Sequence, residues 1–198
     1  MARPSEFDRD QTLLEAAMKL FWCQGYVATS LTQLLEAMGI GRSSFYAAFG
    51  DKRSLFIEVL ELFSERTRQM LVDAWEETGS LDAIQRFFYT TLLEVPRARA
   101  GRGGMTVNTL LELADVDPEL SVLAERKLAG VESVFEDCFG QAQQAGCYAR
   151  GRSARELATH VMVLNQGLRV ASRKRVPRSE LERNIDTALS LTALSLPA

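Results

Sequence analysis

The chain has 198 residues, of which 46% are hydrophobic, 23 are lysine or arginine and 26 are aspartate or glutamate, so its formal net charge is −3. No apolar run approaches the ~20 residues of a membrane-spanning helix, and the charged first ten residues lack the apolar segment of a signal peptide. We therefore expect a cytoplasmic protein without a membrane partner, and the negative charge argues against a protein that coats nucleic acid non-specifically.

Helical periodicity runs along the chain without a convincing strand, so we predict an all-α protein. The first helix extends from about Asp8 to Gln24 and stops at Gly25. Ser30 begins the second helix, with Gln33 three residues later as in a capping box. Gly39 ends this helix, where a positive φ is needed.

A third helix follows after a turn of about three or four residues, the arrangement of a helix-turn-helix. Successive residues step by about 100° around its axis, so Phe45 and Phe49 fall on one side and small residues on the other. Such a face can enter a major groove ~12 Å wide, where serine hydroxyls, an alanine methyl and an arginine fork can contact bases or phosphates. The residues of this face are Ser43, Ser44 and Ala47, with Tyr46 at its edge and Arg42 at the start of the helix.

A long helix begins near Lys52 and ends before Gly79. Lys52 is placed to bind a phosphate, and the segment from Gly39 to Leu55 carries a balance of two positive charges. Because the helix begins inside the predicted DNA-reading unit and continues into the rest of the chain, it is the expected mechanical link between the two parts.

The first quarter of the chain also has the residue spacing of a known family. The spacing is carried by Leu13, Ala17, Phe21, Gly25, Tyr26, Gly39, Tyr46, Phe49, Lys52 and Leu55. Over residues 8–55 the chain resembles the N-terminal domain of TetR-type (tetracycline-repressor-like) transcriptional regulators. The resemblance implies a homodimer that binds a palindromic operator in double-stranded DNA, and a variable C-terminal domain that senses a small-molecule effector.

The resemblance places a set of polar residues at the DNA: Ser30, Thr32, Arg42, Ser43, Ser44, Tyr46 and Lys52. Many relatives carry a polar cap in place of Gly41 and a large residue in place of Ala47 and Ala48, so phosphate contacts from those side chains would be missing here. We predict a helix-turn-helix DNA-binding domain at residues 1–51 and a helical ligand-binding and dimerisation domain at residues 52–198. A three-helix packing unit without nucleic acid is the alternative for the first segment.

The remaining sequence predicts further helices on both sides of a glycine-rich loop. One opens at Ser80 or Leu81 and stops before Pro96. The basic loop from Pro96 to Gly104 has neither a preceding strand nor a following Gly-Lys-Ser/Thr, which disfavours a phosphate-binding loop. The later helices are predicted at Met105 to Ala114, Pro118 to Ala145 with Asp117 as cap, Ser153 to Ser172, and Ser179 to Leu194.

The last two predicted helices carry apolar residues at helical spacing. Paired with a second subunit, they would form a four-helix interface with two-fold symmetry; the alternative is that both stripes close the subunit's own core. The predicted interface residues are Leu157, Val161, Leu164, Leu168, Leu181, Ile185 and Leu189. Between these helices a basic run, which includes Arg169, Arg173, Lys174, Arg175 and Arg178, is predicted to be a solvated helix end, with an anionic ligand or DNA as the alternative.

Family behaviour motivates a ligand pocket between the middle helices. The candidate ligand-binding residues are Phe63, Met70, Phe88, Met105, Asn108, Thr109, Phe135, Met162 and Gln166. Asn108 and Glu112 lie one turn apart and can present polar groups to a cavity. Some relatives with a similar middle segment carry a cysteine in place of Gly104, so a sensor thiol is absent at that position.

Cysteine and histidine are too few for a metal site, so we expect no metal. Cys23, Cys138 and Cys147 form no CxxC pair, and their odd number is typical of a reducing compartment. Cys23 lies in an apolar run that favours a buried thiol, whereas Cys147 follows Gly146 and is expected to be exposed.

Together these patterns predict a ligand-responsive transcriptional repressor that an effector releases from its operator. The alternative is a helical adaptor or small-molecule-binding protein without DNA binding. An enzyme is the least favoured class, because His160 lies in an apolar stretch, no Ser-His-acid arrangement is supported, and no fingerprint of a cofactor is present.

Overall fold

The computed structural model describes residues 6–95, 101–146, 151–174 and 176–191. Cys147, Arg175 and residues 96–100 of the predicted loop lie outside these ranges, as does the predicted end of the last helix. The described ranges contain helices and no strand, which confirms the all-α prediction. The helices are α1 (Glu6–Gln24), α2 (Leu31–Met38), α3 (Arg42–Phe49), α4 (Lys52–Thr78), α5 (Asp82–Leu92), α6 (Met105–Leu113), α7 (Pro118–Gln144), α8 (Ala154–Ser172) and α9 (Arg178–Leu191).

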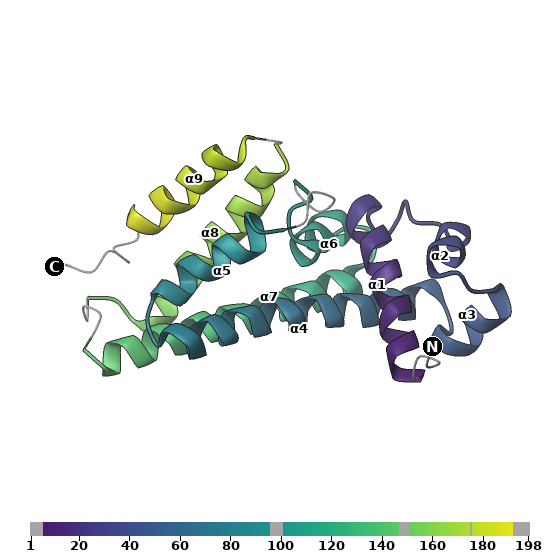
Figure 1. The fold of residues 1–198 in the computed structure, drawn as a ribbon, viewed down its shortest axis with the longest axis horizontal. Coiled ribbons are helices and arrows are strands. Elements are labelled where there is room, and N and C mark those ends of the chain that lie inside the picture. The colour runs from purple at the N-terminus through teal and green to yellow at the C-terminus, as the bar shows by residue number, and fades with distance from the viewer. Residues whose placement is uncertain (1–5, 96–100, 147–150, 175, 192–198) are drawn as a thin grey trace, which may run out of the picture.

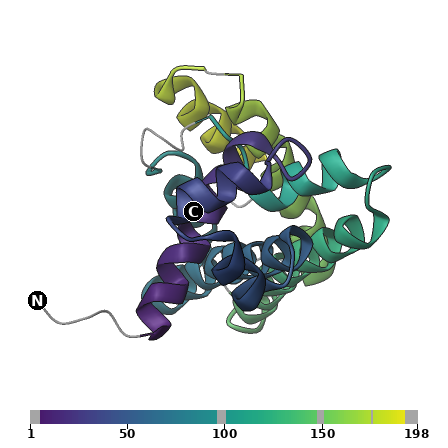
Figure 2. The same cartoon turned by 90° about the vertical axis from the view of Figure 1, so that its right-hand side faces the viewer.

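The two longest helices, α4 and α7, run side by side along the molecule (Figure 1). Helices α1, α2 and α3 gather at one end, which faces the viewer in Figure 2, and α5, α8 and α9 lie toward the other. None of the described helices combines the length and the apolar character needed to cross a membrane.

The predicted helix-turn-helix is built by local signals. The hydroxyl of Ser30 accepts a hydrogen bond from the Gln33 amide at 3.3 Å, and the Gln33 side chain accepts one from the Ser30 amide at 2.9 Å. Gly39 ends α2 with φ of 66°, a left-handed conformation that favours glycine. Gly41 is the N-cap of α3, and because glycine has no side chain it makes no side-chain hydrogen bond that caps the helix.

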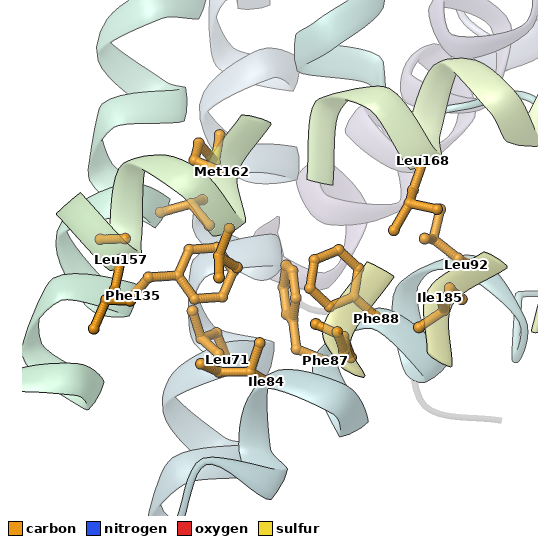
Figure 3. Close-up of a cluster of buried hydrophobic side chains, with 14 of the residues drawn as sticks. Leu71, Ile84, Phe87, Phe88, Leu92, Phe135, Leu157, Met162, Leu168 and Ile185 are labelled. Atoms are coloured by element: carbon orange, nitrogen blue, oxygen red, sulfur yellow. The ribbon is translucent and has the colours of Figure 1, made fainter. Parts of the chain in front are cut away.

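Helix α4 takes part in both buried clusters of the described chain. Its first half gives Leu55 and Val59 to a cluster shared with α1–α3, α6 and the start of α7. Its second half gives Leu71 to a cluster built with α5, α7, α8 and α9. In Figure 3 the rings of Phe87, Phe88 and Phe135 lie at the centre of this second cluster. A change in the second cluster can therefore reach the first through one continuous helix.

The stripes predicted for the dimer interface are buried within one subunit. Of the seven residues, six are at most 7% exposed, and they pack in the second cluster. Leu164 is half-buried. This burial corresponds to the alternative in which the stripes close the subunit's own core. The apolar side chains that α8 leaves at the surface are instead Val163 and Val170.

Asp117 joins the start of α7 to the start of α4. Its carboxylate accepts hydrogen bonds from the Leu120 amide at 3.1 Å and from the Arg53 guanidinium at 3.1 Å. The Arg53 hydrogen bond, followed by that of the Leu120 amide, holds the pKa of this carboxyl below its ordinary value. The stabilisation is fully present above the unfolded-state pKa of ~3.9 and is lost as pH falls through the lower folded-state pKa.

We therefore expect Asp117→Asn to be less stable than the parent chain at pH 7, by at most about 1 kcal/mol because the pair is partly exposed. The difference should shrink as the pH falls below about 4. Urea unfolding at both pH values measures it. Asp115→Asn, the same change at an exposed site two residues earlier, is the control and should stay within about 0.5 kcal/mol of the parent chain at pH 7. A constant difference between Asp117→Asn and the parent across this range would contradict the prediction.

Candidate nucleic-acid interface and cavities

Helix α3 lies at the end of the molecule that faces the viewer in Figure 2. Phe45 and Phe49 are 0% and 8% exposed and hold the helix against the first cluster. On the opposite side Ser43, Ser44 and Ala47 are exposed, as predicted from the helical step. An exposed helical face without bulky side chains is suited to a major groove.

Tyr46 stands at the edge of this face and is 47% exposed. Its ring packs edge-on against Phe45, with 5.6 Å between the ring centroids. The Tyr46 ring therefore packs against Phe45 on one side and remains accessible to solvent. Thr32 is exposed on α2, and the hydroxyl of Ser30 takes part in the capping box.

Lys52 has a structural role that the sequence did not reveal. Its ammonium donates a hydrogen bond to the Thr29 carbonyl at 2.6 Å and lies 4.5 Å from the centroid of the Tyr26 ring. Burial lowers the pKa of this ammonium. These contacts fasten the segment between α1 and α2 to the start of α4. An ammonium group has three N–H donors, so this geometry leaves donors for a phosphate.

The positive charge predicted near α3 is distributed unevenly. Arg53 binds Asp117 at 3.1 Å and Glu119 at 2.7 Å, so its charge is partly neutralised. Arg42 is exposed at the start of α3, and within the described ranges no carboxylate lies within 4 Å of it. Arg42 is therefore the cation that this face offers most freely to an anion.

The candidate ligand-binding residues are divided among several places. Phe63 and Met70 line a cavity of about 90 Å³ between α1, α4, α5 and α8. Met105, Asn108 and Thr109 line a separate open cleft of about 570 Å³ beside the end of α1. The structure therefore does not bring all the candidates into one pocket.

Three other candidates are part of the packed core. Phe88, Phe135 and Met162 are at most 3% exposed and belong to the second cluster. Gln166 is half-buried on α8. Their apolar character at helical spacing reflects core packing within the subunit, which sequence periodicity does not distinguish from the lining of a pocket.

Comparison with known proteins agrees with this geometry. The sequence profile of the "Bacterial regulatory proteins, tetR family" matches residues 13–59, from α1 into α4. The structure of a cysteine-substituted form of the TetR family transcriptional regulator CifR, in complex with a 26-base-pair double-strand operator DNA, is similar throughout. Its sequence is 30% identical, the alignment covers 99% of this chain and 100% of that one, and the TM-score is 0.73. The chain belongs to the TetR family.

Curated TetR-type relatives span the same length. The uncharacterized HTH-type transcriptional regulator YezE of Bacillus subtilis is 26% identical over 96% of this chain and 99% of its own. The HTH-type transcriptional repressor ComR of Escherichia coli is 28% identical over 96% of this chain and 90% of its own. These relatives are regulators, and the prediction of a transcriptional regulator rather than an enzyme is confirmed.

In this TetR-family chain Glu112 connects α6 to the turn between α1 and α2. Its carboxylate accepts hydrogen bonds from the Tyr26 amide at 3.0 Å and the Val27 amide at 2.8 Å. The sequence suggested Glu112 as a polar group for a cavity, and it does line the open cleft. Its partners, 85 and 86 residues earlier, were not predicted, because a long-range contact to backbone amides leaves no local pattern.

The prediction that Cys23 is buried is wrong. Cys23 is exposed, because Ala17 and Phe21 occupy the inward side of α1 and Cys23 follows Phe21 by two residues, about 200° around the axis. Cys138 is buried, and burial, the largest cause, raises the pKa of its thiol to about 12. Thiolate chemistry at Cys138 is therefore suppressed in the folded protein.

Proposed function

We propose that the protein is a dimeric, ligand-responsive transcriptional repressor that inserts α3 into the major groove of a palindromic operator. The observation that carries this proposal is the outer face of α3, where Ser43, Ser44 and Ala47 are exposed and Phe45 and Phe49 anchor the opposite side. Similarity to a regulator whose structure was solved in complex with operator DNA supports the same interpretation. A cytoplasmic location follows from this role.

Each exposed group suits a different DNA contact. The hydroxyls of Ser43 and Ser44 can donate to or accept from base edges, and the methyl group of Ala47 can contact a thymine methyl. Arg42 can bind guanine or phosphate with two parallel hydrogen bonds. The remaining proposed contacts go to the strand backbone, from Ser30, Thr32, Tyr46 and Lys52.

Two subunits are needed to read two half-sites about one DNA turn apart. We place the subunit contact on the exposed sides of α8 and α9, opposite the apolar stripes that are buried in the core. On α8 this side carries Val163 and Val170, which are 61% and 44% exposed. The functional division remains residues 1–51 for DNA and residues 52–198 for ligand binding and dimerisation. The two units share the first buried cluster, so motion in one is felt by the other.

Regulation is proposed to be a population shift. The dimer is proposed to exist in two forms, one with its two α3 helices in register with the half-sites and one with them out of register. An effector that binds more tightly to the second form lowers operator affinity, by an amount set by the ratio of its affinities for the two forms. Helix α4 starts directly after α3 and extends into the second cluster, so it is the element that transmits the change.

The test is Ala47→Glu, which adds bulk and negative charge to the centre of the exposed α3 face. Binding to the promoter fragment upstream of the protein's own gene, followed by fluorescence anisotropy at ~150 mM salt with excess non-specific DNA, should weaken at least about tenfold. Ala129→Glu makes the same change at an exposed site in the middle of α7 and should bind like the parent chain.

Both variants should keep the helical content and the subunit stoichiometry of the parent. Equal affinity of Ala47→Glu and the parent chain would overturn the role of α3. If neither the promoter fragment nor duplexes selected from a random pool are bound, the helical-adaptor alternative replaces the repressor.

A further inference from the structure

One buried cation has no anionic partner within the described part of the chain. Arg169 is 5% exposed although the basic run to which it belongs was predicted to be solvated. Its Nε donates to the Asn165 side-chain oxygen at 2.9 Å, whereas its Nη2 atom finds no hydrogen-bond partner among the described residues. Its neighbours in that run, Arg173 and Lys174, are exposed as predicted.

The surroundings of Arg169 disfavour its charge. Burial is the cause of a lowered pKa, about 10, for this guanidinium. The Phe87 ring lies 5.9 Å away, and no carboxylate is within 4 Å in the described ranges. Leaving a buried charge unpaired is costly, so an anion that reached this group would gain a strong hydrogen-bonding partner.

Gly104 makes room for the guanidinium. A Cβ atom at this position would lie 2.6 Å from Arg169 Cδ and 3.3 Å from its Nε and Nη1 atoms. Gly104 is also the N-cap of α6 and supplies no side-chain cap. The guanidinium therefore lies beside the positive end of a helix, which adds to the cost of leaving its charge unpaired.

Arg169 is part of the wall of the 90 Å³ cavity between α1, α4, α5 and α8. Of the other nine lining residues, five are apolar or aromatic: Met18, Trp22, Phe63, Met70 and Val95. Three more are Thr67, Thr90 and Thr91, whose hydroxyls donate hydrogen bonds within the chain. Arg66 also lines it but already binds Glu15 at 2.9 Å. The cavity thus combines an apolar body with one unpaired cation, which is the complement of an amphiphilic monoanion.

We propose that this cavity binds a small organic monocarboxylate, with the carboxylate on Arg169 and the hydrocarbon part among Trp22, Phe63 and Met70. A planar guanidinium matches a carboxylate, and apolar walls disfavour a fully polar anion such as phosphate. The volume is below the ~150 Å³ of a cavity that holds benzene, so the acid must be short, and a chain longer than about four carbons must extend past Met70, which is 43% exposed. Binding itself stands apart from DNA recognition; its use as an effector signal rests on the proposed function.

The experiment titrates butyrate, isovalerate and hexanoate into the full chain, with isovaleramide as the neutral isostere. Trp22 lines the cavity, and Trp75→Phe leaves it as the chain's remaining tryptophan. We expect at least one acid to change its fluorescence saturably and to bind at least about tenfold more tightly than the amide, with calorimetry giving the dissociation constants.

Arg169→Met should abolish this preference for the acid while keeping the thermal midpoint at or above that of the parent, because it removes an unpaired buried charge. Arg173→Gln changes an exposed arginine one turn later on the chain and should leave acid binding unchanged. The midpoint thus separates loss of the site from loss of the fold.

Three results would overturn the proposal. They are equal binding of acid and amide, loss of acid binding in Arg173→Gln instead of Arg169→Met, and no acid in the panel binding more tightly than about 10 mM. Operator affinity is measured separately. A chain that binds isovalerate but no DNA would contradict the repressor and leave the carboxylate site standing, whereas a chain that binds DNA but none of the acids would do the reverse.

Discussion

Replacing Phe135 with alanine is expected to lower the free energy of unfolding by about 3–5 kcal/mol. Phe135 is 0% exposed and lies between elements of the second cluster (Figure 3). Its ring meets Phe87 edge-on with centroids 5.6 Å apart and stacks over Phe88 with centroids 6.5 Å apart. Removing it leaves a cavity against α5 and also removes two aromatic contacts, so the loss exceeds that of an aliphatic truncation.

Chemical denaturation followed by circular dichroism measures this loss, at one fixed protein concentration because a dimer's stability depends on it. Phe135→Leu keeps most of the buried volume and should lose clearly less. Val122→Ala, on the exposed side of α7, should stay within about 0.5 kcal/mol of the parent chain. A loss below about 1 kcal/mol for Phe135→Ala would contradict its place at the centre of the cluster.

The same experiment tests how the two parts of the chain are joined. Helix α4 gives Leu55 to the first cluster and Leu71 to the second, so we expect one cooperative transition that Phe135→Ala shifts as a whole. A second transition unaffected by the substitution would show that the helix-turn-helix unfolds independently. That result would mean that the proposed boundary near residue 51 separates two units that unfold independently as well as two functions.

Helix ends were predictable because their signals are local. Ser30 with Gln33, the positive φ of Gly39 and the Asp117-Pro118 pair each act within a few residues, and each is present as expected. The outer face of α3 followed from the same kind of reasoning, since the helical step alone separates Phe45 from Ser43.

Packing between distant segments was not predictable in this way. Periodicity showed that α8 has a buried stripe, but it carries no information on whether the same subunit or a second one covers it. Arg169 was grouped with a solvated basic run, yet the absence of a side chain at Gly104, 65 positions earlier, gives it a buried location. Lys52 and Glu112 likewise owe their roles to backbone groups far along the chain.

Replacing Gly25 with alanine is expected to destabilise the protein by about 3 kcal/mol or more, because two costs combine. Gly25 has φ of 85°, where a side chain costs about 1–3 kcal/mol. Its Cβ atom would also lie 2.5 Å from Glu112 Oε2, so the carboxylate must move away from the Tyr26 and Val27 amides. Each charge-assisted hydrogen bond lost in this way costs about 1.5–3 kcal/mol when the donor is left without a substitute, and less where water reaches it.

The matched control is Gly130→Ala in the middle of α7, where a Cβ atom would meet nothing within 4 Å. The same substitution there should stabilise the protein by about 0.5–1 kcal/mol, since glycine is a poor helix former. Opposite signs for the two variants, measured by denaturant unfolding, would show that conformation and the Glu112 contact decide the outcome. A loss at Gly25 no larger than about 0.5 kcal/mol would mean that the turn rearranges freely.

Glu112→Gln separates the two costs, because it keeps glycine at position 25 and weakens only the link from α6 to the turn between α1 and α2. Glu112→Gln should lower the free energy of unfolding by less than Gly25→Ala does. The double variant should lose little more than Gly25→Ala alone, because both substitutions weaken the same contact. Helix α6 starts beside Arg169, and Glu112 near its end binds the turn between α1 and α2, so α6 joins the two places. If Glu112 transmits ligand binding, Glu112→Gln should retain operator affinity but respond less to an acid that binds at Arg169. An unchanged response would place the coupling in α4 or α7, which both contribute to the two clusters.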